Sequence, residues 1–169
     1  MDNIKISDFI FASYSGNTEV VLSLLKKGID INIRDSSSST ALSEAVLKNH
    51  YEVIKILLEN NADVNLIYEN KYNVLHLAAS DTEIDPRIVE LLASKISDIN
   101  QKDKPHKNTA LWYACHFGYP NNYKIAEILL KHGADARLVN AYGKTVMDMA
   151  EIRSDIPEFK QLLQKYQLK

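Results

Sequence analysis

The chain of 169 residues repeats itself, and this repetition limits what it can fold into more than any other feature. A pair of adjacent leucines occurs five times, at spacings of 33, 34, 38 and 33 residues. The pairs are Leu24-Leu25, Leu57-Leu58, Leu91-Leu92, Leu129-Leu130 and Leu162-Leu163. A residue that can begin a helix recurs at Thr40, Asn73, Thr109 and Thr145. An aspartate stands two residues before an asparagine or arginine at Asp30, Asp63, Asp98 and Asp135. Three markers with one period indicate copies of a single structural unit.

Each copy predicts two short helices joined by a turn. Helices of about 8–10 residues are not stable alone, so the copies must stack to bury their apolar faces. An alanine recurs in the first helix of every copy and lets neighbouring first helices pack closely: Ala12, Ala45, Ala78, Ala114 and Ala150. The polar stretches between copies, such as residues 33–39 and 66–72, predict reverse-turn fingers rather than strands. The expected fold is therefore an all-α solenoid of about five helix-turn-helix repeats.

We expect one domain over residues 1–169, with repeats at approximately 4–33, 34–66, 67–100, 101–137 and 138–167. In the first repeat, Ser7 and Thr18 are the expected helix N-caps. Asn61 stands where the first repeat has Gly28, and asparagine tolerates the left-handed backbone that ends a helix there. The turn between the helices of the third repeat, which ends at Pro86, is expected to be one residue longer than in the second.

These residues resemble the ankyrin repeat over about residues 5–165. Its helix start appears as TALSEAV, NVLHLAA, TALWYAC and TVMDMAE, and its end as GIDIN, NADVN, SDIN and GADAR. The resemblance implies an ankyrin-repeat solenoid with a concave face, made of fingers and first helices, that holds protein partners. The chain departs from the family pattern at the finger turn, where Ser38, Lys71 and Lys107 replace a glycine that only Gly143 retains. We expect those three fingers to be less regular.

Composition limits the cellular location and the partners that we expect. The formal net charge is -2, but residues 1–85 hold seven Lys and Arg against thirteen Asp and Glu, and residues 86–169 hold thirteen against nine. A single cysteine excludes an internal disulfide framework and fits a reducing compartment. The start has no basic leader followed by an apolar core, and no run of about 18 apolar residues exists. We expect a cytoplasmic protein that neither enters a membrane nor binds nucleic acid.

Catalytic and metal-binding patterns are not found. Cys115 and His116 are adjacent on a helix, so they point in different directions and cannot act together as nucleophile and base. The acidic stretch from Asp81 to Asp85 is not a calcium loop, because Pro86 and Leu92 stand where such a loop needs glycine and an acid. We therefore expect no enzyme activity, cofactor or metal. The family resemblance gives His76 a structural hydrogen bond near the finger.

With no catalytic or metal site expected, the candidate functional site is a protein-binding surface. Large apolar side chains at positions expected to face the groove are typical of interface hot spots, although each could instead pack on a neighbouring repeat. Trp112 in particular is favoured as a structural ring between fingers. The candidate partner-binding residues are Tyr14, Leu47, Lys48, Glu69, Asn70, Tyr72, Asp81, His106, Trp112, His116, Phe117, Tyr142, Lys144 and Arg153.

These features predict a protein that is monomeric on its own and binds another protein through its concave face. The leading hypothesis is an inhibitor or immunity-type protein, whose acidic N-terminal half could mask a basic toxin or enzyme. A scaffold or a host-directed effector is the alternative within binding proteins. A regulatory subunit of an enzyme is the alternative from another class.

Overall fold

The computed structural model describes residues 5–68, 72–117, 120–152 and 157–167. These residues form ten helices and no strand. The helices are α1 (Ile6–Tyr14), α2 (Thr18–Lys26), α3 (Ala41–Leu47), α4 (Tyr51–Glu59), α5 (Val74–Ser80), α6 (Pro86–Ala93), α7 (Ala110–Phe117), α8 (Pro120–Lys131), α9 (Val146–Ile152) and α10 (Pro157–Gln167). The prediction of an all-α solenoid is confirmed.

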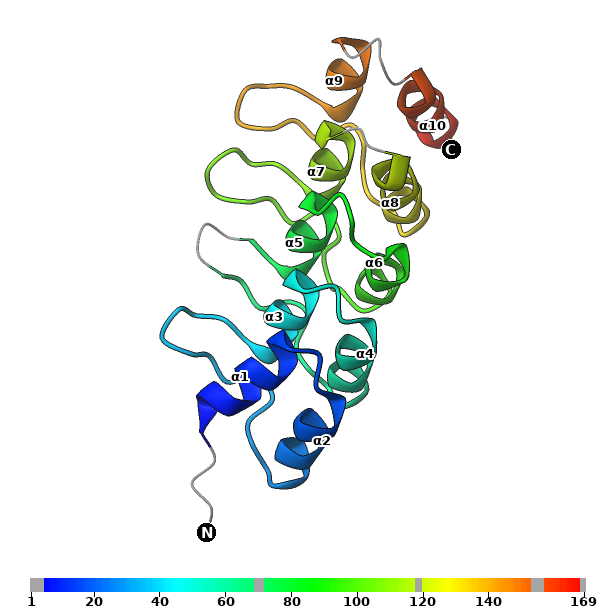
Figure 1. Ribbon diagram of the computed structural model, residues 1–169. Helices are drawn as coiled ribbons and strands as arrows, with labels where there is room; N and C mark the ends of the chain where they lie inside the picture. The colour runs from blue at the N-terminus through cyan, green and yellow to red at the C-terminus, as the bar shows by residue number, and fades with distance from the viewer. Residues whose placement is uncertain (1–4, 69–71, 118–119, 153–156, 168–169) are drawn as a thin grey trace.

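The helices stand in two parallel columns (Figure 1). The inner helices α1, α3, α5, α7 and α9 pack on one another in order, and each also packs on the outer helix that follows it. The segments that lead into α3, α5, α7 and α9 project from the inner column on the side away from the outer helices (Figure 1). We call them fingers 1 to 4, for residues 34–40, 67–73, 102–109 and 139–145; of finger 2, only residues 67, 68, 72 and 73 are described.

The core lies between the two columns and runs from Phe9 in α1 to Leu163 in α10, both of which are fully buried. The recurring alanines hold the inner helices close together, since none is more than 6% exposed. This close packing was predicted from the repeat and is confirmed.

The recurring helix-start residues are N-caps. Thr40 accepts a hydrogen bond from the Ser43 N–H at 3.1 Å, and the Ser43 hydroxyl oxygen accepts from the Thr40 N–H at 2.9 Å. Asn73 and Thr145 form the same reciprocal pair with the residue three positions on. Such a capping box satisfies two N–H groups that a helix start otherwise leaves unpaired.

The first repeat is capped differently from the prediction. Lys5, not Ser7, is the N-cap residue of α1, and its side chain makes no cap hydrogen bond. Asn17, not Thr18, caps α2 by accepting from the Val20 N–H at 3.1 Å. The α2 prediction was wrong by one residue because Asn17 and Thr18 are both competent caps. The α1 prediction was wrong by two residues because the helix begins at Ile6 without a side-chain cap.

The recurring aspartate and asparagine tie consecutive repeats together. Each aspartate accepts the N–H two residues later, and each asparagine oxygen accepts an N–H of the next repeat. The bonds between repeats run from Asp63 N–H to Asn32, from Ser97 N–H to Asn65 and from Asp135 N–H to Asn100, at 2.8 to 2.9 Å. Arg137 breaks the series, since its guanidinium turns back to Asp135 at 2.8 Å.

In the third repeat, the leucine pair does not coincide with the buried positions of the outer helix. Leu92 and Ala93 occupy the buried places of the leucine pair, while Leu91 is only half-buried. The inner-to-outer turn is two residues longer than in the second repeat, not one: Pro86 begins its helix twelve residues after Val74, and Tyr51 ten after Ala41. The extra residues shift α6 by one place relative to the leucine pattern.

The fingers are more regular than expected. Ser38 adopts a left-handed backbone with φ of 63°, close to the 69° of Gly143. Both donate to the carbonyl three residues earlier, at 3.0 and 3.1 Å, so finger 1 is as regular as finger 4 and the prediction was wrong there. Lys107 is also left-handed, but finger 3 is one residue longer. Lys71 lies outside the described residues.

Candidate partner-binding site

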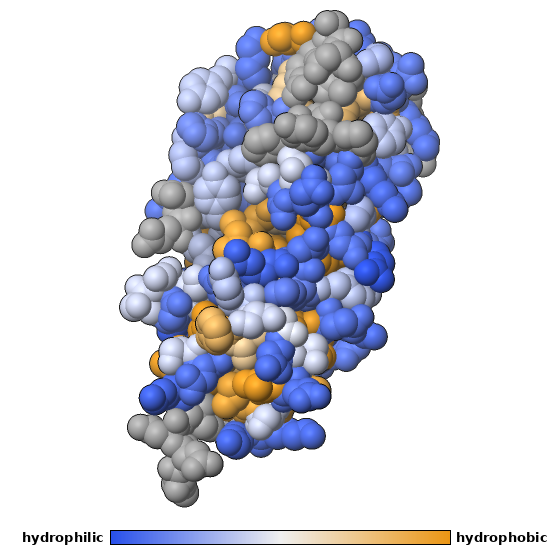
Figure 2. Space-filling model, in the orientation of Figure 1, coloured by the Kyte–Doolittle hydropathy of each residue, from blue (hydrophilic) through white to orange (hydrophobic). Residues whose placement is uncertain are grey.

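The side of the inner helices that the fingers overhang carries two columns of residues. One column contains Tyr14, Leu47, Ser80, His116 and Ile152, of which Tyr14, Leu47 and His116 were predicted as partner-binding residues. The other lies three residues earlier, on the same helix face, and contains Phe11, Glu44, Leu77, Tyr113 and Met149. We call this surface, together with the fingers, the finger–helix face. In the view of Figure 2, hydrophobic surface over the inner helices is broken into patches by hydrophilic residues.

A groove of about 820 Å³ opens between α1 and finger 1. Its apolar lining comes from α1, and its polar lining is Ser7, Arg34, Asp35, Ser36, Ser37, Ser39 and Glu44. Phe11 is 67% exposed and stacks on Tyr14, whose ring lies 4.5 Å from the Lys48 ammonium. Asp35 fixes the polar wall by accepting two N–H groups of the finger.

Sequence reasoning placed Tyr14 and Lys48 on this surface but missed Phe11 and Ile6. The signal was present. The consecutive residues Phe9, Ile10 and Phe11 cannot all face one core from a single helix, so one large apolar side chain had to be exposed.

The middle of the face holds a cluster of interacting rings. The Tyr72 and Tyr113 hydroxyls form a hydrogen bond, and Tyr113 donates to the Asp103 carboxylate at 2.7 Å. The His76 ring lies edge-on to both tyrosines. Burial, together with the Tyr72 and Asp103 partners, raises the pKa of Tyr113 well above its usual range. Tyr72 was expected as a partner-binding residue, and its hydroxyl is already bound within the chain.

His76 has the structural place that the resemblance implied. It is 1% exposed, and its Nδ1 lies 2.7 Å from the Asn73 side-chain oxygen. Burial lowers the pKa of His76, although the Asp103 charge acts in the opposite direction.

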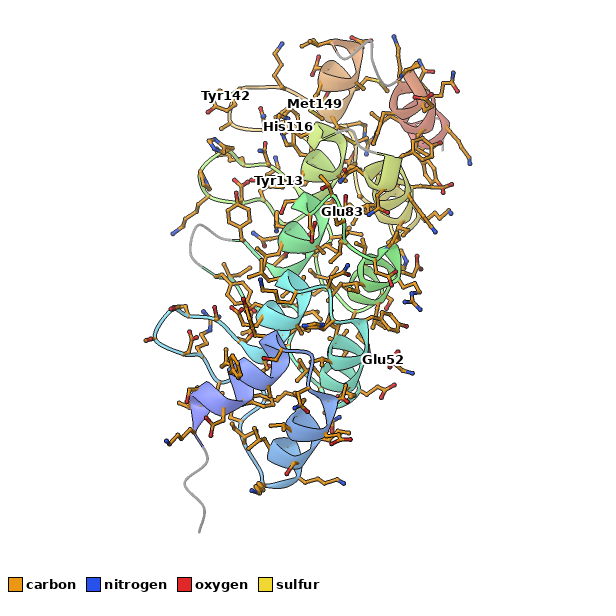
Figure 3. The ribbon with its side chains drawn as sticks, viewed as in Figure 1. Glu52, Glu83, Tyr113, His116, Tyr142 and Met149 are labelled. Carbon is orange, nitrogen blue, oxygen red and sulfur yellow. The ribbon has the colours of Figure 1, made fainter. Side chains whose placement is uncertain are left out.

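Fingers 3 and 4 are joined side by side. The His106 and Tyr142 rings stack at 6.0 Å, and the Ala141 N–H donates to the His106 carbonyl at 2.7 Å. Tyr142 is 70% exposed, and Lys144 beside it is also exposed. Tyr113, His116, Met149 and Tyr142 lie on the finger side of the ribbon (Figure 3).

The remaining candidates differ in their surroundings. Leu47 is 55% exposed, as expected for a contact residue. Trp112 is half-buried against the core, and its backbone N–H donates to the Thr109 hydroxyl at 3.3 Å. Asp81 accepts from the Glu83 N–H at 2.9 Å and so holds its own turn. Glu69, Asn70 and Arg153 lie outside the described residues, as does the side chain of Phe117.

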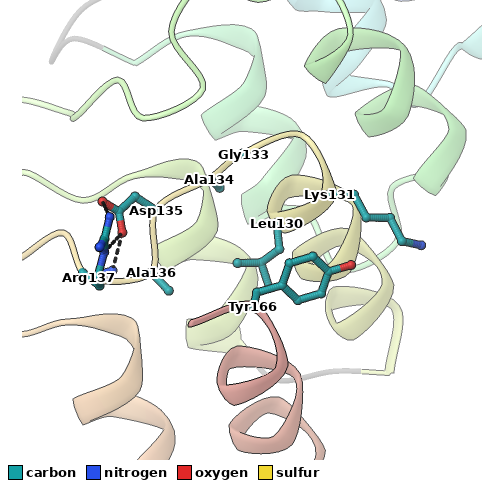
Figure 4. Close-up of a pocket in the computed structure, with 8 residues that line it drawn as sticks. All are labelled: Leu130, Lys131, Gly133, Ala134, Asp135, Ala136, Arg137 and Tyr166. Carbon is teal, nitrogen blue, oxygen red and sulfur yellow. Dashed lines mark hydrogen bonds and ion pairs between the residues drawn. The ribbon is translucent and has the colours of Figure 1, made fainter. Parts of the chain in front are cut away.

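Several features bear on catalysis. Cys115 is 2% exposed, and burial raises the pKa of its thiol to about 12. Among the described residues, no group of three His, Cys, Asp or Glu is placed to hold a metal ion. A pocket of about 450 Å³ under α8 is lined by Asp135, Arg137 and Tyr166, and the first two pair with each other (Figure 4). No described helix is long and apolar enough to cross a membrane.

Comparison of the sequence with known proteins agrees with the helix pairs and fingers of the structure. The sequence model for ankyrin repeats, in three copies, matches residues 9–68 and 75–168. The ankyrin repeat protein FPV034 of Fowlpox virus (strain NVSL) is 36% identical over 119 residues, covering 70% of this chain and 26% of its own length. Inversin of Mus musculus is 30% identical over 134 residues, covering 78% and 12%. The chain thus spans 26% and 12% of the length of these relatives.

A relative of similar size also exists. The ankyrin repeat protein YahD of Escherichia coli (strain K12) is 25% identical over 190 residues, covering 93% of this chain and 94% of its own length. Together with the matched repeats, the helix pairs and the fingers, these similarities lead to one conclusion. The chain belongs to the ankyrin-repeat family.

Proposed function

We propose that this chain binds another protein through its finger–helix face and acts by occupying part of that partner's surface. Ankyrin repeats are protein–protein interaction modules, so family membership supports the general function. The observation that carries the choice of face is the groove beside finger 1. Phe11 and Tyr14 expose 67% and 41% of their surface there, and exposed aromatic side chains in a concave site are typical of binding hot spots.

The opposite side of the molecule offers less to a partner. A hollow of about 480 Å³ lies across α4, α6 and α8, but most of its charged side chains are paired within the chain. Arg87 binds Asp85 at 2.6 Å and stacks over Tyr51, and Lys131 binds Glu127 at 3.4 Å. A partner would have to compete with these contacts, whereas the rings beside finger 1 are open to solvent.

The finer proposal is an inhibitor or immunity-type protein that sequesters a toxin or enzyme. The ankyrin-repeat model matches nearly all of this sequence. Such an inhibitor would therefore act by binding its target rather than by catalysing a reaction. The proposed basic partner has less support. Five acids of residues 1–85 accept N–H groups of their own turns, and of these only Asp35 lines the groove beside finger 1: Asp30, Asp35, Asp63, Asp81 and Asp85.

A native pull-down tests the proposal. The wild-type chain should retain a stoichiometric partner, and Phe11→Ala with Tyr14→Ala should weaken its binding by about 2–4 kcal/mol, the scale of hot-spot truncations. Val20→Ala with Leu22→Ala on α2 is the matched control, since these side chains are 39% and 38% exposed but lie outside the groove. Equal binding by all three proteins would overturn the choice of face.

The partner's own activity separates the finer roles. Activity that falls in proportion to added chain supports an inhibitor. Activity that is unchanged while two proteins bind together supports a scaffold or effector. Activity that rises or changes specificity supports a regulatory subunit.

A further inference from the structure

We propose that the C-terminal half of the finger–helix face binds an acidic, extended segment of the partner. This inference rests on the proposed function and names the chemistry of the partner at one end of the face. Its starting point is the charge of fingers 3 and 4. Residues 102–109 and 139–145 contain four lysines and one acid, Asp103. Asp103 is 2% exposed, so the charge that the two fingers present to solvent is positive.

The Asp103 carboxylate is also fully engaged inside the chain. One oxygen accepts from Tyr113 at 2.7 Å, and the other accepts from the His106 N–H at 2.9 Å. It therefore fixes the shape of finger 3 instead of neutralising the lysines around it.

Three of the four lysines are available to a partner. Lys104, Lys107 and Lys144 are exposed, and none of them forms an ion pair with a carboxylate among the described residues. Lys102 differs, because its ammonium donates to the Val139 carbonyl at 2.7 Å and links the two fingers.

Acids near these lysines are already bound to other groups. The Asp148 carboxylate accepts from the Thr145 N–H and hydroxyl, both at 2.7 Å, and Lys144 lies near enough to help lower its pKa. Glu151 pairs with Lys160 at 3.8 Å, on the α10 side. The acids of α9 thus cap or pair locally, and the finger lysines keep their charge for a ligand.

The inner helices add an apolar floor. Ile152 on α9 is 78% exposed and Tyr142 on finger 4 is 70% exposed. Met149 and Tyr113 are half-buried, pack against the core and lie on the finger side of the ribbon (Figure 3). The lysines come from two adjacent fingers that are joined side by side, so they form a basic rim along this end of the face. A chain segment that alternates acidic and apolar side chains fits both the rim and the floor.

Selection from a displayed library of random 12-residue peptides tests this inference. Wild-type chain is the bait. Enriched sequences should be net negative, with apolar residues between the acids. Their binding should fall at least about tenfold in the variant Lys104→Glu, Lys107→Glu, Lys144→Glu, since each reversal replaces an attraction by a repulsion. A neutral variant with glutamine at the same three positions should show a smaller loss.

The matched control reverses Lys26, Lys55 and Lys95, which are exposed on the outer-helix side, and so changes the net charge equally. Circular dichroism confirms that each variant is folded. Enriched peptides that are neutral or basic, no enrichment at all, or an equal loss in the control would each overturn the inference. Peptides that ignore the lysines but are lost with Phe11→Ala would overturn it while leaving the proposed function standing. Peptides unaffected by either change would contradict both.

Discussion

Asn49 and Asn121 bind the same loop from its two sides. Asn49 donates to the Glu83 carbonyl at 3.0 Å and accepts from the Asp85 N–H at 2.8 Å. Asn121 donates to the carbonyls of Thr82 and Ile84 at 3.1 and 2.7 Å. The longest described turn between an inner and an outer helix is thus held by the repeats before and after it. Its acidic residues therefore belong to a fixed structural element.

Removing either asparagine should destabilise the solenoid. Asn121→Ala leaves two carbonyls without their donor and should lower the free energy of unfolding by about 1–3 kcal/mol, as should Asn49→Ala. Urea unfolding of both single variants and the double variant measures the coupling through the loop, expected to exceed about 0.5 kcal/mol. Asn60→Ala is the control, since its side chain bonds only within α4. Strict additivity of the two losses would contradict a shared loop.

The asparagine hydrogen bonds that link consecutive repeats, which we call the ladder, predict that Asn65 contributes more to stability than Arg137. Asn65→Ala removes the acceptor of the Ser97 N–H and hydroxyl and should cost about 1 kcal/mol of stability. Arg137→Ala at the end of the series should change stability by less than about 0.5 kcal/mol, because its ion pair is at the surface. Thermal or urea unfolding decides the order, and a larger loss for Arg137→Ala would refute the ladder.

A glycine at the left-handed position of finger 1 should increase the stability of the chain. Ser38 holds a backbone conformation that disfavours a side chain, so Ser38→Gly should stabilise the chain by about 0.5–1 kcal/mol. Gly143→Ala should destabilise it by about 1 kcal/mol, although no neighbouring atom would meet the added methyl group. A destabilising Ser38→Gly would show that the hydroxyl, not the backbone, determines the preference.

Much of this fold can be predicted from local sequence, because its unit is short and its contacts recur between neighbours. The buried alanines, the caps of α3, α5, α7 and α9 and the turn at Asn61 all depend on residues within one repeat. The position of α6 cannot be read the same way. The leucine pair at residues 91–92 predicts one register, and the lengthened turn held by Asn49 and Asn121 imposes another.

The candidate site was less predictable for a related reason. Tyr72 and Phe11 are both large and aromatic, and sequence alone favoured the first. Tyr72 finds a hydrogen-bond partner in Tyr113, forty-one residues away, while Phe11 stacks on Tyr14 and remains 67% exposed. Which ring is left open to a partner depends on contacts between repeats.

A buried histidine makes stability depend on pH. The pKa of His76 is lowered in the folded chain, so below about pH 6.5 the unfolded chain takes up a proton that the folded chain refuses. Above about pH 6.5 this effect costs no stability. As the pH decreases toward the pKa of His76 in the folded chain, the free energy of unfolding should fall by at most about 1.4 kcal/mol per pH unit.

Urea unfolding between pH 7.5 and 5.5 measures this slope. His76→Ser should lower stability at every pH by leaving a cavity, but it should remove the slope. Serine is chosen because Ser43 closes the capping box at the same place in the second repeat. An unchanged slope in this variant would assign the pH dependence to other groups.

The most direct test of the central claim is amide hydrogen exchange of the chain with and without its purified partner. Binding through the finger–helix face predicts slower exchange in peptides that cover α1 and fingers 1, 3 and 4, with little change in α4, α6 and α8. Phe11→Ala with Tyr14→Ala should reduce this protection at equal partner concentration. Protection confined to α4, α6 and α8 would contradict the account.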